Sequence, residues 1–183
     1  LSSNFMVLAT QNPVELSGTF PLPEAQMDRF LMRIRMGYPS KEEEQEIVLR
    51  FEKGTHVLPE VSPLSTEGIA RLKTKAKEVY LSRELVDYLS EISRRTRSLR
   101  GIEMGVSPRA TLALARACKS YALIRGRSYV IPDDIKDLAV PVLAHRLVVS
   151  QDMFYRGKTQ DDVVREVLES VRVPVGDREE GTA

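Results

Sequence analysis

The chain has 183 residues, 42% hydrophobic and 29% charged, with a formal net charge of +1. This balance predicts a globular protein and excludes one strongly acidic or basic field as its dominant feature. The lone cysteine, Cys118, excludes an internal disulfide framework and fits a reducing compartment. No apolar run approaches the roughly 20 residues that cross a bilayer, and no signal peptide precedes the first segment, so we expect a soluble, cytoplasmic protein.

The balanced total conceals a basic block in the middle of the chain. Residues 69–127 carry 14 Lys and Arg against 5 Asp and Glu, whereas both flanks are acidic on balance. Such a block, with five arginines between residues 83 and 100, could bind nucleic-acid phosphates. Few aromatic side chains interleave these arginines, and a solvated face or a contact with an acidic neighbour explains them better. We do not expect nucleic acid as the partner.

The N-terminal segment predicts an incomplete α/β unit. Residues 5–9 are continuously apolar, as in a strand covered on both faces, and residues 30–36 alternate like an edge strand. A short helix is expected from about Glu24. Because about 40 residues cannot complete such a sheet, we interpret the chain as part of a longer protein. We expect the strands of residues 1–37 to be disordered, rearranged or paired with another copy.

From Ser40 onward the pattern predicts helices. Ser40 and Glu43 form the S-x-x-E capping box of a helix that ends before Gly54. After a proline-containing connector, serine or threonine caps and first-turn prolines predict four more helix starts. These starts lie at Ser65 or Thr66, Ser82, Ser107-Pro108 and Pro132. A last helix is expected at about 161–171, and Pro141 should kink or end the helix that contains it.

The residue chemistry leaves two readings open at the first strand and at the short helix. Asn12 would lie at the carboxyl end of a parallel strand, where its amide could orient a water molecule or hold a phosphate oxygen. Alternatively, Asn12-Pro13 merely starts a turn. Arg29 is either a functional cation or the partner of Asp28 or Glu24 in a surface ion pair. For the histidines, His56 and His145, we predict surface or packing roles.

Two long strings of sequence carry a resemblance to a known family. They are ATQNPVELSGTFPLPEAQMDRFLMRIRMGYPSKEEE and GVSPRATLALARACKSYALIRGRSYVIPDDIKDLAVPVLAHRL. Both closely resemble the C-terminal half of MoxR-type AAA+ ATPases, with magnesium-chelatase and MCM-like ATPases as related alternatives. The resemblance covers most of the chain and is weakest in residues 52–80 and after residue 150.

The resemblance implies roles for individual residues. Asn12 in ATQNP corresponds to sensor 1, which helps place the water that attacks the γ-phosphate. Arg29 in EAQMDRF corresponds to the arginine finger presented to a neighbouring subunit. Arg109 in GVSPRA corresponds to sensor 2, which reaches nucleotide phosphate. Tyr38 lies at the junction of core and lid and is expected to border the adenine.

The resemblance also implies a fold and an activity. We expect a mainly α chain, with the last strands of a P-loop NTPase core in residues 1–38, a helical lid in 39–175 and a flexible tail in 176–183. The parent protein would hydrolyse ATP with Mg²⁺ in a ring, expected to be a hexamer, and remodel protein complexes, sometimes beside von Willebrand factor A domain proteins.

The phosphate-binding loop G-x-x-x-x-G-K-S/T and an acidic magnesium-binding strand are absent from this sequence. We therefore expect the isolated 183 residues to have no ATPase activity. The competing hypothesis is a non-enzymatic helical module that binds nucleic acid or an acidic protein through residues 83–127.

Overall fold

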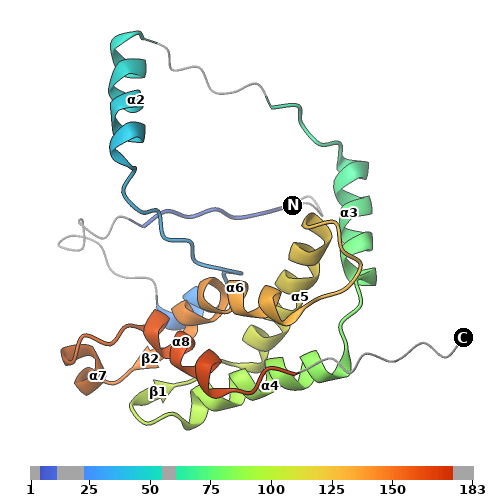
Figure 1. Cartoon of the computed structure of the whole chain (residues 1–183), viewed down its shortest axis with the longest axis vertical. Helices are drawn as coiled ribbons and strands as arrows, with labels where there is room; N and C mark the ends of the chain where they lie inside the picture. Colours follow the sequence, from blue (N-terminus) through green and yellow to red (C-terminus); the bar gives the residue numbers. More distant parts are fainter. Residues whose placement is uncertain (1–4, 12–22, 55–60, 175–183) are drawn as a thin grey trace, which may run out of the picture.

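The computed structural model of the chain describes residues 5–11, 23–54 and 61–174 (Figure 1). The described chain is mainly helical, as predicted. Its core is a bundle in which α5 packs against α4 and α6, and α8 packs against α4 and α6. The bundle helices are α4 (Arg83–Ser98), α5 (Pro108–Ile124), α6 (Pro132–Leu143) and α8 (Gln160–Ser170).

The starts of the bundle helices follow local capping chemistry. The Ser82 side chain accepts a hydrogen bond from the Leu85 N–H, and Ser107 caps α5 in the same way. Pro132 occupies the first position of α6, where its missing N–H costs no hydrogen bond. These predicted starts are confirmed. Pro141 lies near the end of α6, which passes directly into a short 3₁₀ helix, η2 (Ala144–Arg146).

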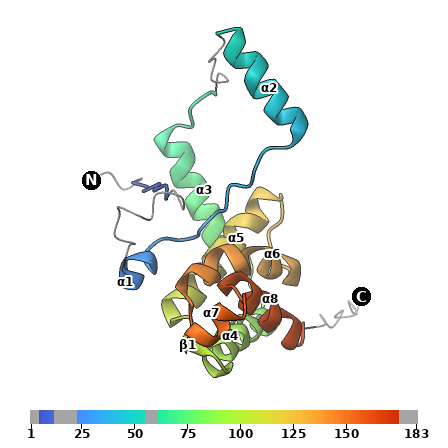
Figure 2. The ribbon, with the colours of Figure 1, turned by 90° about the vertical axis from the view of Figure 1, so that its left-hand side faces the viewer.

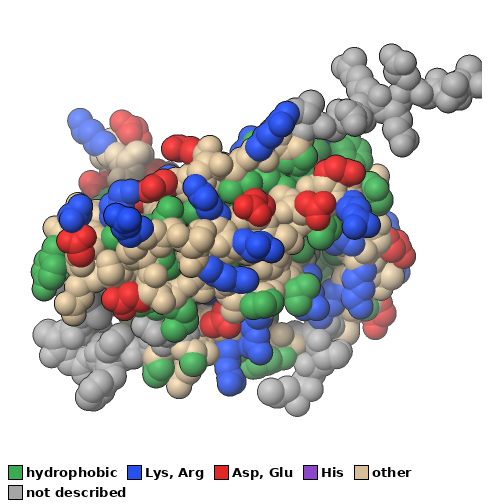
Figure 3. All heavy atoms as spheres, turned by 90° about the horizontal axis from the view of Figure 1, so that it is seen from below, with side chains coloured by type: hydrophobic (Ala, Val, Ile, Leu, Met, Phe, Trp, Pro, Cys, Tyr) green, Lys and Arg blue, Asp and Glu red, His purple; other side chains and the backbone are tan. Residues whose placement is uncertain are grey.

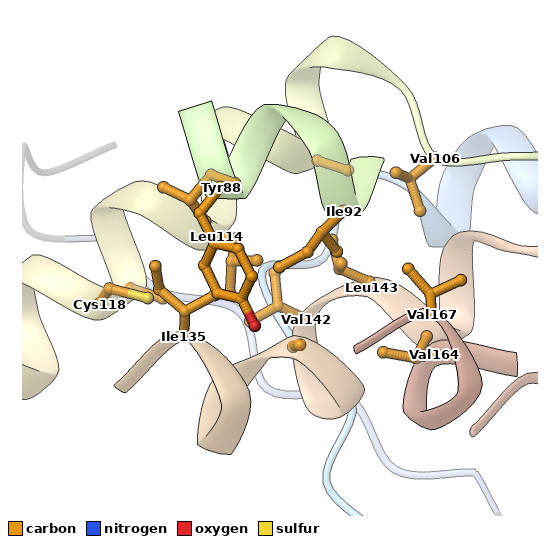
Figure 4. Packing of buried hydrophobic residues seen from close by; sticks show 14 of the residues in the cluster. Tyr88, Ile92, Val106, Leu114, Cys118, Ile135, Val142, Leu143, Val164 and Val167 are labelled. Carbon is orange, nitrogen blue, oxygen red and sulfur yellow. The ribbon is translucent and has the colours of Figure 1, made fainter. Parts of the chain in front are cut away.

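The interior of the bundle is apolar and closely packed (Figure 4). Each helix contributes fully buried side chains, and burying one such side chain stabilises the fold by about 1.5–3 kcal/mol. The largest of them are Leu89 and Ile92 of α4, Leu114 of α5, Ile135, Val142 and Leu143 of α6, and Val163, Val164 and Val167 of α8.

A small antiparallel sheet closes one end of the bundle and was not predicted. It pairs β1 (Ile102–Met104) with β2 (Val148–Val149), directly before the short helix α7 (Gln151–Tyr155). Gly101, with φ +87°, makes the turn into β1, and its carbonyl accepts a 2.8 Å hydrogen bond from the Ser150 N–H. The sheet therefore fixes the entrance to the α4–α5 connection.

Two longer helices, α2 and α3, lie between the short helix α1 (Glu24–Met27) and the bundle in the described part of the chain. No residue of α2 (Lys41–Glu52) is buried, and Figures 1 and 2 show this helix apart from the bundle. The capping box between Ser40 and Glu43 is formed as predicted. Ser65 caps α3 (Thr66–Glu78), which packs along α5. None of the helices in the described ranges is both long and apolar enough to cross a membrane.

The strands predicted for residues 5–9 and 30–36 are not formed. Residues 5–11 and 31–40 have no regular secondary structure, although the short helix α1 (Glu24–Met27) lies where it was expected. A strand requires a neighbouring strand for its backbone hydrogen bonds, and the described residues offer none to either segment. The segment after α1 instead lies on the bundle, where the Arg33 N–H donates to the Pro141 carbonyl at 2.8 Å.

Candidate functional site

Arg109 is the second residue of α5. The Ser107 side chain caps this helix by accepting from the Ala110 N–H at 3.4 Å, and Pro108 occupies the first turn. The Arg109 side chain is exposed. Because a helix N-terminus carries unpaired N–H groups and a partial positive charge, the guanidinium and the helix end together can bind a phosphate group.

The loop before Arg109 is held firmly on α4. The buried Val106 N–H donates to the Thr96 hydroxyl at 3.1 Å, and its carbonyl accepts from Arg97 Nε at 2.9 Å. Gly105 lies so close to α4 that an added Cβ would stand 2.6 Å from Arg97 Cγ and 2.8 Å from Arg97 Cα. Both backbone groups of Val106 are therefore fixed three residues ahead of Arg109.

Arg29 lies in the turn that follows α1. Its N–H donates to the Gln26 carbonyl at 3.2 Å, and its side chain is exposed. The neighbouring Asp28 forms its ion pair with Arg146 rather than with Arg29, because its carboxylate Oδ1 lies 3.2 Å from Nε of Arg146. The Asp28–Arg29 surface pair considered from the sequence is thus replaced by a long-range pair, and Arg29 faces solvent.

Arg146, in η2, is a residue that sequence reasoning missed. Its Nη1 donates to the Val142 carbonyl at 3.0 Å, and its Nη2 donates to the carbonyls of Phe30 at 2.6 Å and Asp28 at 3.3 Å. Its Nε lies within ion-pair distance of Asp28 but without hydrogen-bond alignment. A signal was present, because a His-Arg pair in the otherwise apolar stretch 142–149 is unusual for a solvated face.

The pKa of Arg146 is shifted by burial and by two neighbouring charges. Burial lowers the pKa of Arg146, the Asp28 carboxylate opposes this shift, and the positive charge of Arg109 adds to it. An arginine still remains protonated at neutral pH. Of these three effects, burial is the largest and that of Arg109 the smallest.

His145 supports the same turn. Its Nε2 lies 3.3 Å from the Phe30 carbonyl, so this nitrogen carries the hydrogen and donates it. Burial lowers the pKa of His145, and the charge of Arg146 acts in the same direction. The packing role predicted for His145 is confirmed, whereas His56 lies outside the described residues.

A second ion-pair cluster attaches the residues that follow the Arg29 turn, Arg33 and Arg35, to the bundle. Arg33 Nη2 lies 3.1 Å from Oδ1 of Asp161, and Arg35 Nε lies 3.1 Å from Oδ2 of the same carboxylate. Asp161 belongs to the first turn of α8 and its side chain is only 13% exposed. Residues 28–35 are thus attached to the bundle at both ends.

The matches to family models fall on the two regions that form this site. Residues 1–32 match the model described as the ATPase family associated with various cellular activities (AAA), and residues 94–167 match the AAA lid domain. The chain is 42% identical over 176 residues to the uncharacterised protein YeaC of Bacillus subtilis, and 40% identical over 183 residues to the chaperone MoxR1 of Mycobacterium tuberculosis. The chain belongs to the MoxR-type AAA+ ATPases.

The matches also measure how much of these relatives the MoxR-type chain spans. The alignments cover 96% and 95% of this chain but 55% of YeaC and 48% of MoxR1, so it spans about half of their length. A crystal structure of a candidate ATPase from Cytophaga hutchinsonii superimposes with a TM-score of 0.86 at 32% identity. That match covers 96% of this chain and 56% of the other.

Two further residues are expected at the nucleotide in a MoxR-type ATPase, and the structure describes one of them. Asn12 lies outside the described residues. Tyr38 is 98% exposed and lines an open hollow beside the first turns of α2, together with Pro39 and Ile47. The structure therefore places Arg29 in a turn held by Arg146 and leaves Tyr38 on the connection to α2.

The described residues fit the phosphate part of a nucleotide better than its magnesium ion. Arg109 at the start of α5 suits a phosphate oxygen. Among the residues that the structure describes, no cluster of three His, Cys, Asp or Glu side chains could hold a metal ion.

The basic block of this MoxR-type chain is partly structural. Arg97 is committed to the Val106 carbonyl, and Lys119 Nζ donates to the Lys77 carbonyl at 2.8 Å. On the face seen in Figure 3, Asp and Glu side chains lie among the Lys and Arg side chains. That face lacks the single-sign patch typical of nucleic-acid binding.

Proposed function

We propose that this chain supplies the nucleotide-responsive arginines and the lid of a MoxR-type AAA+ ATPase. The parent protein hydrolyses ATP with Mg²⁺ in a ring, taken to be a hexamer, and uses movement of the lid to remodel protein complexes. The observation that carries the proposal is the exposed Arg109 at the N-terminus of α5, on a loop whose backbone is fixed to α4.

The proposed chemistry is electrostatic. Arg109 binds a phosphate oxygen of the nucleotide, and Arg29 reaches the nucleotide of the neighbouring subunit, where it stabilises charge that develops on the transferred phosphoryl group. Asn12 orients the attacking water in its own subunit, and Tyr38 borders the adenine. The residues that bind Mg²⁺ and cradle the phosphates belong to the part of the relatives that this chain does not match.

The remodelling role is supported by the relatives. MoxR1 is named a chaperone, and we extend that role to the protein that carries this chain, with a von Willebrand factor A domain protein as the candidate partner. The proposed domain limits are a core segment in residues 1–38, the lid in 39–175 and a tail in 176–183. Cytoplasmic location is part of the same proposal.

The test uses the full-length protein that carries this chain. We expect Arg29→Ala to lower kcat roughly 10³-fold or more, as for other arginine fingers, and Arg109→Ala to weaken nucleotide binding and turnover together. Arg116→Ala is the matched control, because Arg116 is also exposed and lies two turns further along α5. Wild-type turnover in both Arg29→Ala and Arg109→Ala would refute these roles.

A simpler measurement examines the fragment. The purified 183-residue chain should show no ATP turnover above buffer, because its sequence contains no phosphate-binding loop. Turnover that copurifies with the chain and disappears in Arg109→Ala would contradict this expectation.

A further inference from the structure

Arg146 is a buried cation, and among the described residues its polar partners come from two places. Its side chain is 3% exposed. One partner is the Val142 carbonyl in its own helical segment, and the others are the Asp28 carboxylate and the carbonyls of Asp28 and Phe30. A buried guanidinium without partners is strongly unfavourable. Arg146 therefore requires the turn at residues 28–30 to remain in place.

The same contacts determine the backbone around Arg29. The Phe30 and Asp28 carbonyls that accept from Arg146 Nη2, at 2.6 Å and 3.3 Å, belong to the residues on either side of Arg29. His145 Nε2 adds a second donor to the Phe30 carbonyl at 3.3 Å. With both flanking carbonyls turned towards the bundle, the Arg29 side chain is left exposed.

The lid side of this contact is rigid. Val142, Leu143 and Ala144 are 0–1% exposed and belong to the core cluster, so Arg146 projects from a well-packed segment.

We propose that Arg146 is a positioning residue that fastens the Arg29 turn to the lid of its own subunit. This inference rests on the proposed function only where it concerns turnover, since the attachment itself is a property of the fold. Through this attachment, Arg29 would move together with the lid of its own subunit. Arg29 is proposed to act at the nucleotide of the neighbouring subunit, whereas the lid carries Arg109, which is proposed to bind a different nucleotide. A change in lid position when nucleotide binds would then alter the position of Arg29 through the contact between Asp28 and Arg146, and so affect the next subunit of the ring.

Hydrogen exchange in the full-length protein tests the attachment without reference to activity. We expect Arg146→Met, which keeps an apolar stem of similar length, to raise exchange at the amides of residues 28–32 at least tenfold, with α4 unchanged. Asp161→Asn is the matched control, because it releases Arg33 and Arg35 and leaves the contacts of Arg146 intact. Unchanged exchange at residues 28–32 in Arg146→Met would overturn the inference.

A double-mutant cycle, measured as ATP turnover, tests whether Arg146 affects turnover through Arg29. Arg146→Met should lower kcat tenfold or more with a much smaller change in KM, and Asp28→Asn should act in the same direction more weakly. In the Arg29→Ala background, Arg146→Met should have no further effect, because the group that it positions is gone. Multiplicative effects of the two substitutions would contradict a positioning role.

The two tests separate the two proposals. If Arg29→Ala retains wild-type turnover, the finger role fails while the exchange measurement still decides whether Arg146 holds the turn. If Arg29→Ala is inactive and Arg146→Met has normal exchange and turnover, the finger stands and the positioning role fails.

Discussion

The hydroxyl of Thr96 joins two segments of the lid at once. It accepts a hydrogen bond from the Val106 N–H at 3.1 Å and donates to the Ser93 carbonyl at 2.7 Å, within a fully buried environment. A single side chain of α4 thereby satisfies a backbone donor of the loop that leads to Arg109.

Thr96→Val should destabilise the chain by about 1–3 kcal/mol, because the isosteric side chain leaves the buried Val106 N–H without its acceptor. Urea unfolding of the 183-residue chain measures this loss. Thr96→Ser keeps the hydroxyl and should lose less. Thr74→Val on the exposed face of α3 is the matched control and should change stability little. Equal stability of Thr96→Val and the unmodified chain would disprove the assigned hydrogen bond.

Gly105→Ala should destabilise the fold by about 1–3 kcal/mol through overpacking. The new Cβ would meet the Arg97 backbone at 2.8 Å and 2.9 Å, and a helix backbone cannot move aside cheaply. Thermal unfolding gives the difference, with Gly37→Ala as the control, since its added Cβ would meet no described residue within 4 Å other than its chain neighbours. A larger loss in Gly37→Ala than in Gly105→Ala would contradict this packing.

Asp134→Asn should lower Tm by roughly 5–10 °C, because it weakens a buried network. Asp134 is 2% exposed, and its Oδ2 accepts from the Ile131 N–H and from Arg127 Nη1, each at 2.9 Å. Asp133→Asn next to it is the comparison, because the Asp133 side chain is 72% exposed in its pair with Lys136. Such surface pairs contribute little, so similar losses in the two variants would refute the network.

Stability should fall as the pH drops below about 6.5, and His145 should account for part of that fall. Its pKa is lowered by burial and then by Arg146, so the unfolded chain binds a proton at a higher pH than the folded chain. The stabilisation is complete above the unfolded pKa of about 6.5 and is lost as the pH falls towards the folded pKa. Thermal unfolding between pH 8 and pH 5 measures the slope.

His145→Gln should flatten that slope, since it removes the titrating group. His56→Gln tests the other histidine of the chain. If the slope disappears in His56→Gln and persists in His145→Gln, the assignment to His145 is wrong.

The helical part of the fold was predictable because its signals are local. Ser82, Ser107 and Pro132 mark helix starts through caps and first-turn geometry that depend only on nearby residues. The β1–β2 pair was not predictable in this way. Its residues Ile102 and Val149 pair across a long stretch of sequence, and strands of two or three residues have too little periodicity to detect.

The residues of the candidate site likewise fall into those that local sequence motifs predict and those that depend on distant partners. Arg29 and Arg109 were predicted as site residues through family resemblance in contiguous motifs, and these roles remain predictions. Arg146 and Asp161 escaped, because their partners Asp28 and Arg33 lie more than a hundred positions away in the chain. The strand pattern at residues 30–36 forms no strand in this chain, as expected for a segment without its sheet neighbours, because a local pattern cannot supply the strand that its hydrogen bonds need.

Because α2 is exposed, we expect it to be less stable against unfolding than the helical bundle. Its Ser40–Glu43 capping box and its Glu46–Arg50 ion pair are local interactions, and none of its residues is buried. A helix of 12 residues that buries none of them is marginal in water. In the isolated chain α2 should therefore melt on its own, at lower temperature than the bundle and without the sharpness of a cooperative transition.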